Sequence, residues 1–216
     1  MAKNLLIVES PAKTRTLKKF LGRQYAVEAS VGHVRDLVKK DMGIGPDYEP
    51  RYEVLAAKKD VVKKLREAAK QADTVYLAPD PDREGEAIAW HIAEILDKKP
   101  EAIRRVTFNE ITKRAVLKAL ENPGTIDLKK VDAQQARRVL DRMMGFRLSP
   151  LLWEKVKQGL SAGRVQSVAL KMVCDRQAEI DVFQPEEYWN LGADLKGSVP
   201  PPFTARLHRG CGSRWP

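Results

Sequence analysis

The feature that most constrains the fold is an alternation of short apolar runs with amphipathic stretches over residues 3–121. The first run, KNLLIVE at residues 3–9, is continuously apolar and ends in an acid. That pattern is typical of a buried strand in a parallel sheet. A helix start follows directly, because Ser10 suits the N-cap and Pro11 suits the first helical position. Gly22 suits the end of that helix.

The same alternation continues along the chain. Residues 25–37 are predicted to form a second strand and a Gly-containing turn, and 38–53 show no clean period and are expected to form a loop. Further strands are predicted at 74–79 and 104–108, and helices at 57–72, 84–97 and about 110–121. This order predicts an α/β domain with a mostly parallel sheet.

The pattern changes after the segment NPGTIDLKK at 122–130. From about 131 to 182 the chain is expected to be helical, with breaks at 145–150 and 159–163. A strand-like segment follows and is interrupted by the prolines at 200–202. We therefore divide the chain into residues 1–122, a mostly helical part at 131–192, and a truncated or irregular tail at 193–216.

The charge balance indicates the kind of partner. Lys and Arg outnumber Asp and Glu by 39 to 29, which gives a formal net charge of +10 and attracts polyanions such as nucleic acid. The apolar run LLIV at 5–8 is too short for a signal sequence or a membrane span. The two cysteines, Cys174 and Cys211, lie outside any Cys/His cluster, which argues against a zinc site or a disulfide framework. We expect a cytoplasmic protein that does not contact membranes.

Acidic residues are crowded into one stretch of this basic chain, APDPDREGEAIAWH at 78–91. Its four carboxylates are Asp80, Asp82, Glu84 and Glu86. Asp80 and Asp82 follow a predicted strand, at the edge where open α/β sheets bind ligands, and their spacing lets them share one face. Glu9 ends another predicted strand and would join them if the two strands are neighbours. Converging carboxylates suit Mg²⁺. The alternative is that these acids cap a helix and complement its dipole.

Six segments then carry a resemblance to a known family. They are LLIVESPAKT, GHVRDL, DPDREGEAIAWH, FNEIT, QQARRVLDRMMGF and GLSAGRVQS, in that order. Together they resemble the amino-terminal part of the bacterial type IA DNA topoisomerases, over residues 3 to about 192. Residues 3 to about 120 resemble the Rossmann-like Toprim domain, and residues from about 130 resemble the start of the DNA-gripping domain.

The resemblance implies a chemistry and a partner. It implies that Glu9, Asp80, Asp82 and Glu84 hold Mg²⁺ beside a scissile phosphate, and that Glu9 is catalytic, moving a proton at the leaving 3′ oxygen. The implied reaction is transesterification, in which a tyrosine cleaves and religates one DNA strand and so relaxes negative supercoils. The implied partner is DNA, chiefly single-stranded segments of negatively supercoiled DNA. We expect the protein to be a monomer.

The resemblance also implies DNA contacts at thirteen positions: Lys13, His33, Arg137, Arg138, Asp141, Phe146, Trp153, Ser161, Ala162, Gly163, Arg164, Val165 and Gln166. Three-four spacing supports part of this set, because it places Arg137, Arg138 and Asp141 on one helix face. Most of these positions have an ordinary alternative. Lys13 and His33 would be solvated polar residues, Arg137 and Asp141 a surface ion pair, Phe146 and Trp153 core aromatics, and 159–167 a plain loop-to-helix junction.

The tyrosine that the implied reaction requires is not recognisable in these 216 residues. None of the five tyrosines lies in a segment of the form YxRTDS. We therefore expect a fragment that lacks the nucleophile and does not relax DNA alone. Two other functions stay open: a non-catalytic single-stranded DNA-binding Toprim module, and another Toprim phosphoryl-transfer enzyme such as a primase or nuclease.

Overall fold

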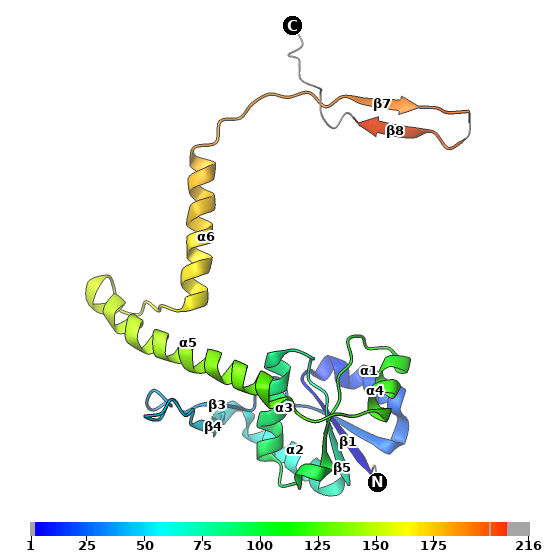
Figure 1. Cartoon of the computed structure of the whole chain (residues 1–216), viewed down its shortest axis with the longest axis vertical. Helices are drawn as coiled ribbons and strands as arrows, with labels where there is room; N and C mark the ends of the chain where they lie inside the picture. The colour runs from blue at the N-terminus through cyan, green and yellow to red at the C-terminus, as the bar shows by residue number, and fades with distance from the viewer. Residues whose placement is uncertain (1–2, 199, 207–216) are drawn as a thin grey trace. The chain divides into compact units, whose positions relative to one another are not determined.

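The structure is a computed structural model that describes residues 3–198 and 200–206 (Figure 1). The chain divides after residue 167 into two units. The first contains a sheet and most of the helices, and the second contains most of helix α6 and a strand pair.

The centre of the first unit is a four-stranded parallel sheet in the order β2-β1-β5-β6. Its strands are β1 (Asn4–Val8), β2 (Tyr25–Ala29), β5 (Thr74–Leu77) and β6 (Ile103–Arg105). The four apolar residues of β1, Leu5 to Val8, are fully buried, as expected for a strand covered on both faces. The predicted α/β class with a mostly parallel sheet is therefore confirmed.

Helices cover both faces of this sheet: α1 (Pro11–Leu21), α2 (Lys59–Gln71), α3 (Arg83–Ile95) and α4 (Lys113–Glu121). Alternate residues of β1 point to opposite faces. Ile7 packs with Leu65 of α2 and Ile92 of α3, while Leu6 packs in a second cluster with Leu17 of α1 and Val116 of α4. Three short 3₁₀ turns lie at Gly22–Gln24, Ala56–Lys58 and Pro100–Ala102.

The start of α1 forms as the sequence predicts. Ser10 has extended backbone and its side chain accepts a hydrogen bond from Ala12 N at 3.2 Å, with Pro11 in the first helical position. Gly22 ends the helix with a φ of 63°, a conformation that favours glycine.

Two short strands lie outside the main sheet. β3 (Arg35–Leu37) pairs with β4 (Tyr52–Val54) in antiparallel register, with Leu37 opposite Tyr52. Residues 52 and 53 were expected in a loop, so β4 differs from the prediction. A strand of three residues is too short for alternation to reveal it, and only its pairing with β3 identifies it.

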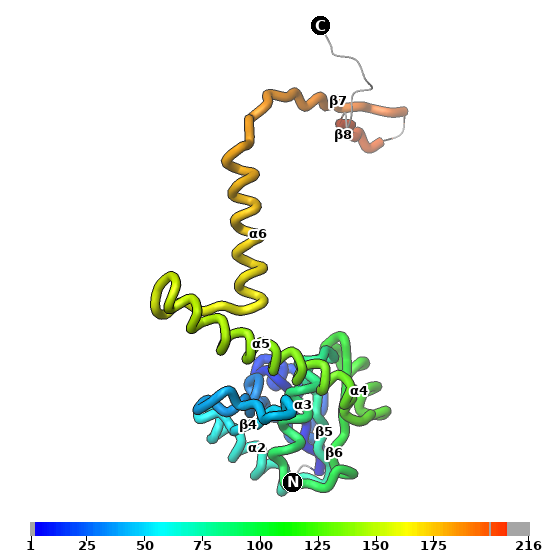
Figure 2. Tube along the Cα trace, turned by 60° about the vertical axis from the view of Figure 1, so that its left-hand side comes forward, coloured from blue at the N-terminus to red at the C-terminus, as the bar shows by residue number. Residues whose placement is uncertain are grey.

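Helix α5 (Leu128–Lys155) begins at Asp127, whose side chain accepts hydrogen bonds from Lys129 N at 3.0 Å and Lys130 N at 3.4 Å. It is continuous through Pro150, so the predicted break at 145–150 is wrong. One proline removes a single backbone hydrogen bond, and here it lies close to the helix end. α5 packs along α3 in the first unit, as Figures 1 and 2 both show.

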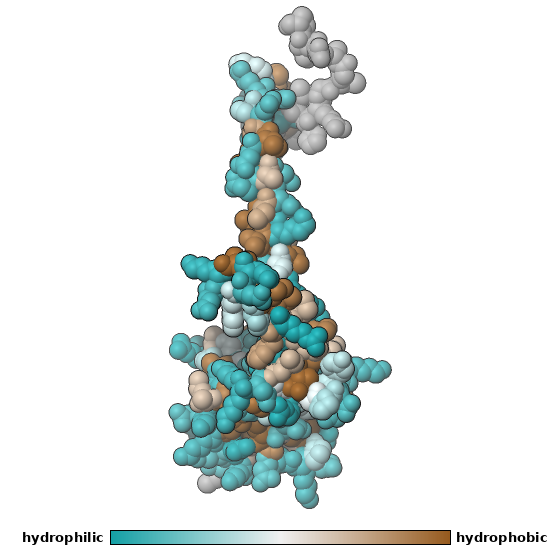
Figure 3. All heavy atoms as spheres, turned by 90° about the vertical axis from the view of Figure 1, so that its left-hand side faces the viewer, coloured by the Kyte–Doolittle hydropathy of each residue, from teal (hydrophilic) through white to brown (hydrophobic). Residues whose placement is uncertain are grey.

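Helix α6 (Arg164–Asp181) starts in the first unit and continues into the second, where hydrophobic side chains lie along it (Figure 3). Two antiparallel strands follow, β7 (Gly192–Leu195) and β8 (Phe203–Arg206), so the part of the expected irregular tail before residue 207 contains paired strands. Residues 207–216 of that tail lie outside the described residues. Within the described chain, every helix is too short or too polar to cross a membrane.

Candidate active site and nucleic-acid interface

The carboxyl ends of β1 and β5 form the first part of the site. The two strands are parallel neighbours with Ile7 opposite Leu77, so Glu9 and Asp80 follow at the same edge of the sheet. The condition that the sequence analysis set for a shared site is therefore met. Lys13, in the first turn of α1, reaches this edge and its ammonium contacts the Asp80 carboxylate. Lys13 is thus not a purely solvated lysine.

The acidic stretch divides into different roles. Asp82 is the N-cap of α3 and accepts a hydrogen bond from Gly85 N at 2.7 Å, so the capping alternative holds for this residue. Glu84 lies in the first turn of α3, and its Oε1 is 3.4 Å from His33 Nε2. Glu86 is only 3% exposed and its carboxylate is held by Arg105, so it is a buried structural residue.

The predicted metal ligands lie at one edge but do not form a closed cluster. Among the described residues, no three His, Cys, Asp or Glu side chains are close enough together to hold a metal ion. Asp80 faces Lys13, and Asp82 is engaged by the backbone of α3. The donors are carboxylate oxygens, which suit Mg²⁺, and Glu9 and Asp80 follow adjacent strands. The residues fit the ion in chemical type, but in this structure Asp80 is paired with Lys13 and Asp82 caps α3.

A buried arginine, Arg105, binds the backbone of the acidic loop that follows β5. Arg105, at the end of β6, is 3% exposed and its Nε lies 3.0 Å from Glu86 Oε2. Its Nη atoms donate hydrogen bonds of 2.7–3.2 Å to four carbonyl oxygens, those of Leu77, Pro79, Asp80 and Val106. Glu86 also accepts from Asp127 N at 2.8 Å, which ties the start of α5 to the same group. Arg105 was not predicted as a site residue, because nothing in RRVTF at 104–108 distinguishes the buried Arg105 from the exposed Arg104.

His33 is presented by a turn between β2 and β3. Val31 and Gly32 both have positive φ, 57° and 81°, and this left-handed pair reverses the chain just before His33. The ring lies near Glu84 at the start of α3. The structure therefore brings two expected site residues together, although they are 51 positions apart.

Arg138 joins α5 to β3. Its guanidinium binds Asp36 in a fork, with Nε to Oδ1 at 2.9 Å and Nη2 to Oδ2 at 2.6 Å. Burial alone would raise the pKa of Asp36, but hydrogen bonds from Arg138 and Leu37 N, with the charges of Arg138 and Arg142, hold that pKa below its usual value. Asp36 was missed by the sequence analysis, although it lies inside the GHVRDL segment.

Two further expected residues converge on Asp141. Arg164 Nε lies 2.7 Å from Asp141 Oδ1, and Arg137 Nε lies 3.9 Å from Asp141 Oδ2. The second distance describes the ordinary surface ion pair that was the alternative for Arg137. Both arginines remain more than 40% exposed, so an anion can still approach them.

The aromatic residues of α5 lie outside the core. Phe146 is 43% exposed with the Arg142 guanidinium 5.2 Å from its ring centre, and Trp153 is 47% exposed and donates to Leu160 O at 2.6 Å. The core alternative for these two residues is therefore wrong. Both line a cavity of about 540 Å³ that also contacts Arg138 and Ser161.

The GLSAGRVQS segment closes one side of this cavity. The Ser161 hydroxyl lies 3.3 Å from Gln166 Oε1, and Ala162 N donates to Ser149 of α5 at 3.3 Å. Gly163 immediately precedes α6, and its carbonyl accepts from Ser167 N at 2.9 Å. Val165, expected to contact DNA, is 63% exposed.

Comparison with known proteins identifies the family. A Toprim domain model matches residues 4–111, and a DNA topoisomerase model matches residues 125–206. The solved structure of full-length topoisomerase I from Thermotoga maritima is 48% identical and has a TM-score of 0.73. That match covers 87% of this chain and 32% of the T. maritima chain.

The parallel sheet with acids at its carboxyl edge is thus a Toprim domain. With the second match and the similarity to the T. maritima enzyme, the chain belongs to the bacterial type IA DNA topoisomerases. It spans about a third of the length of that solved relative.

Proposed function

We propose that this chain binds single-stranded DNA and Mg²⁺ and supplies these parts of a type IA topoisomerase. The whole reaction is cleavage and religation of one strand by transesterification, which relaxes negative supercoils. The observation that carries the proposal is the contact of Lys13 with Asp80 at the shared edge of β1 and β5, the edge at which Glu9 follows β1. A cation and a hard oxygen donor meet at the strand edge that Glu9, the candidate proton carrier, also follows, and this supports the proposal.

Each residue at this edge has a role that its position supports. Lys13 contacts a phosphate oxygen of the strand once DNA competes with Asp80 for its ammonium, and the positive end of the α1 dipole favours the same anion. Glu9 donates a proton to the 3′ oxygen as it leaves and removes it again for religation. Glu9, Asp80, Asp82 and Glu84 are the residues that would hold Mg²⁺, and a bound ion would supply positive charge against the phosphate.

The DNA path follows the α5 face and the start of α6. Arg137 and Arg164 are exposed enough to contact phosphates, which positions a strand without reading its sequence. Phe146 and Trp153 present exposed rings on which bases can stack, and such stacking contributes about 1–3 kcal/mol per base. Ser161 and Ala162 line the same cavity, and the cationic Arg164 follows them at the start of α6.

The metal part is tested by calorimetric titration with Mg²⁺. The double variant Asp80→Asn with Asp82→Asn should bind Mg²⁺ at least tenfold more weakly than the unmodified chain, because two anionic donors become neutral. Asparagine also caps helices well, so α3 keeps its start. Asp47→Asn, at an exposed loop position, is the control and should leave binding unchanged. Equal Mg²⁺ affinity in the double variant would contradict the metal site.

The DNA part is tested by titrating a short single-stranded oligonucleotide at two salt concentrations. Arg164→Ala and Arg137→Ala should each lower affinity several-fold and reduce the salt dependence, because each removes a phosphate contact. Lys118→Ala on α4 also removes one exposed cation and should have little effect. If all three variants behave alike, the interaction is general charge attraction without a defined path.

For the 216-residue polypeptide alone, we propose a narrower function. It acts as a cytoplasmic monomer that binds DNA, and it does not relax supercoiled plasmid, because none of its tyrosines has the YxRTDS setting. A plasmid relaxation assay tests this directly, and any relaxation would contradict it. Metal-dependent nicking or nucleotide incorporation would instead support a nuclease or primase.

A further inference from the structure

The outer side of helix α2 carries a row of exposed cations. Its members, which we call the α2 stripe, are Lys59, Lys63, Arg66 and Lys70. They follow one another at intervals of four, three and four residues, so their side chains project from one narrow strip of the helix. At about 1.5 Å per residue, the row is about 16 Å long.

Most of the charge of the α2 stripe is not neutralised by a contacting carboxylate. Within the described residues, α2 forms one ion pair, between Lys64 and Glu28 at 2.6 Å, and Lys64 projects from a different side of the helix. Glu67 lines the same hollow of about 410 Å³ as the four cations of the stripe. Asp97 lines an adjoining hollow near Lys70. The first hollow therefore keeps an excess of positive charge, which attracts polyanions.

Arg66 is held in place in the middle of the stripe. Its Nε donates a hydrogen bond to the carbonyl oxygen of Ile95, at the end of α3, at 2.8 Å. Its Nη groups have no hydrogen-bond partner in the described part of the chain. A guanidinium that is already fixed loses little side-chain freedom when it binds a phosphate, and it can donate two parallel hydrogen bonds to it. The stripe is thus suited to phosphate groups.

The exposed side chains of α2 indicate which polyanion fits. Besides the stripe they are Asp60, Lys64, Glu67 and Gln71. In this helix, which the structure describes completely, no exposed aromatic ring offers a surface on which the bases of a single strand could stack. Val61 and Ala68 pack against the core, so they do not project into a lipid bilayer. A straight row of cations alone matches a DNA duplex, in which each strand carries one phosphate per about 3.4 Å of axis.

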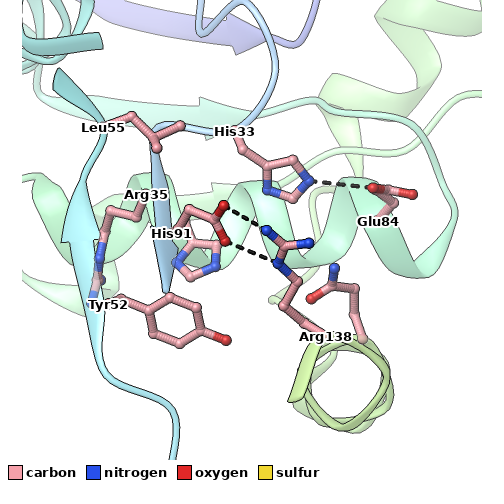
Figure 4. Close-up of a pocket in the computed structure, with 9 residues that line it drawn as sticks. His33, Arg35, Tyr52, Leu55, Glu84, His91 and Arg138 are labelled. Carbon is pink, nitrogen blue, oxygen red and sulfur yellow. Dashed lines mark hydrogen bonds and ion pairs between the residues drawn. The ribbon is translucent and has the colours of Figure 1, made fainter. Parts of the chain in front are cut away.

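The α2 stripe lies apart from the proposed single-strand path. Val54 of β4 lines the hollow together with the stripe. The other side of the β3–β4 hairpin faces α5, where Arg138 reaches the hairpin beside a small cavity of about 170 Å³ (Figure 4). Figures 1 and 2 both show the hairpin between α2 and α5. A duplex on α2 and a single strand on α5 would therefore occupy different surfaces.

We propose that the α2 stripe is a second DNA-binding surface, which holds the backbone of a duplex segment. Its three lysines neutralise phosphates along the backbone, and Arg66 hydrogen-bonds one of them. Such contacts hold the duplex without reading its base sequence. The inference goes beyond the proposed function and does not rest on it, because these contacts need neither the Mg²⁺ site nor the α5 path.

The test titrates a short blunt duplex and a thymidine oligonucleotide against the 216-residue chain at two salt concentrations. The α2 triple variant is Lys59→Gln with Lys63→Gln and Lys70→Gln, and it keeps residues that favour a helix. Its affinity for the duplex should fall about tenfold or more, with a weaker salt dependence, because three phosphate contacts are lost. Its affinity for the thymidine oligonucleotide should fall no more than that of the control.

The matched control removes the same charge from the opposite face of the sheet. It is the triple variant Lys18→Gln with Lys19→Gln and Lys118→Gln, which changes exposed lysines of α1 and α4. Long-range attraction to DNA falls equally in the two triple variants, so the difference between their duplex affinities measures contact with the α2 stripe. Thermal melting checks that both variants are folded.

Three outcomes would overturn the inference. The first is that the unmodified chain does not bind the duplex, and the second is that both triple variants lose the same duplex affinity, which would show general charge attraction. The third concerns Arg164→Ala, which should weaken binding of the single strand more than binding of the duplex. If it weakens duplex binding as much as the α2 triple variant does, the duplex lies on the α5 path.

Vesicles of anionic phospholipid test the alternative partner. If the α2 triple variant loses vesicle binding while duplex binding stays intact, the stripe is a membrane contact and the inference is wrong. Binding of the thymidine oligonucleotide by the unmodified chain tests the proposed function separately. Its absence, with duplex binding that depends on the α2 stripe, would overturn the proposed single-strand function and leave this inference standing.

Discussion

Asp36 and Arg138 are 102 positions apart in the chain, yet they form the bidentate contact that joins strand β3 to helix α5. Arg142, one turn further along α5, donates to the carbonyl oxygens of Leu37 and Val38 at 3.1 and 3.2 Å. Two arginines of one helix therefore hold it against the β3–β4 hairpin. The same contact fixes one wall of the cavities on both sides of Arg138.

We predict that Asp36→Ala weakens both folding and DNA binding. The substitution leaves Arg138 without its carboxylate partner and should lower the free energy of unfolding by about 1 kcal/mol. The loss is small because Arg138 is 42% exposed and is screened by solvent. Single-strand affinity should fall several-fold because the guanidinium is no longer held in place. Urea unfolding and oligonucleotide titration measure the two effects, with Asp47→Ala as control. Unchanged oligonucleotide affinity would show that Asp36 does not position Arg138 for DNA.

Gly85 gives a second prediction, because the acidic loop packs directly on it. A Cβ at this position would lie 2.8 Å from Asp80 N and closer still to Asp80 O, so Gly85→Ala must displace the loop. We expect Gly85→Ala to lower the free energy of unfolding by about 1–3 kcal/mol and to weaken Mg²⁺ binding. In Gly124→Ala the nearest atom is Arg105 O at 3.9 Å, which makes it a tolerated control. Equal stability of the two variants, compared by urea unfolding, would mean that the loop adapts freely.

The Arg105–Glu86 pair gives a third prediction. Arg105→Met leaves a buried carboxylate and four carbonyl oxygens without their donor, and such a loss costs about 3–5 kcal/mol. The neighbouring exposed residue supplies the control, since Arg104→Met should change the free energy of unfolding little. Adding Glu86→Gln to Arg105→Met should recover part of the loss, because the unpaired charge is removed. A loss as small as that of Arg104→Met would show that the buried pair contributes little.

The fold was largely predictable because its signals are local. The continuous apolar residues of β1 and the Ser10-Pro11 helix start specify their own structures, and alternation of strands with helices then specifies a parallel sheet. β4 was not predicted because three residues are too few to show the alternation of apolar and polar side chains that marks a strand. The continuity of α5 was not expected because Pro150 and Gly145 are typical of a break, whereas the helix continues through both to Lys155.

The site was predictable only where a motif marked it. Lys13 and Asp80 were both chosen from the sequence, and the parallel pairing of β1 with β5 explains why they meet. Asp36 and Arg105 were missed because their partners lie far away in the chain. No local pattern shows that Arg105 is buried against the carbonyl oxygens of the β5 end, or that Asp36 engages a helix 102 positions later.

The last prediction concerns His91 and pH. Burial, reinforced by the charges of Arg35 and His33 and opposed by Asp36, lowers the pKa of His91 to about 3 in the folded protein, against an ordinary value of 6.5. Between pH 3 and pH 6.5, His91 therefore binds a proton in the unfolded chain but not in the folded protein. The stabilisation from neutral His91 is therefore complete above pH 6.5 and is lost as the pH falls toward 3.

Between pH 7 and pH 5 this difference should lower the free energy of unfolding by about 2 kcal/mol. His91→Gln cannot titrate, so its stability should fall less over the same interval, whatever its stability at pH 7. Urea unfolding at half-unit pH steps compares the two slopes, and comparing slopes removes any direct cost of the substitution. Parallel slopes for the two proteins would mean that water reaches the His91 ring in the folded state and that its burial does not hold it neutral.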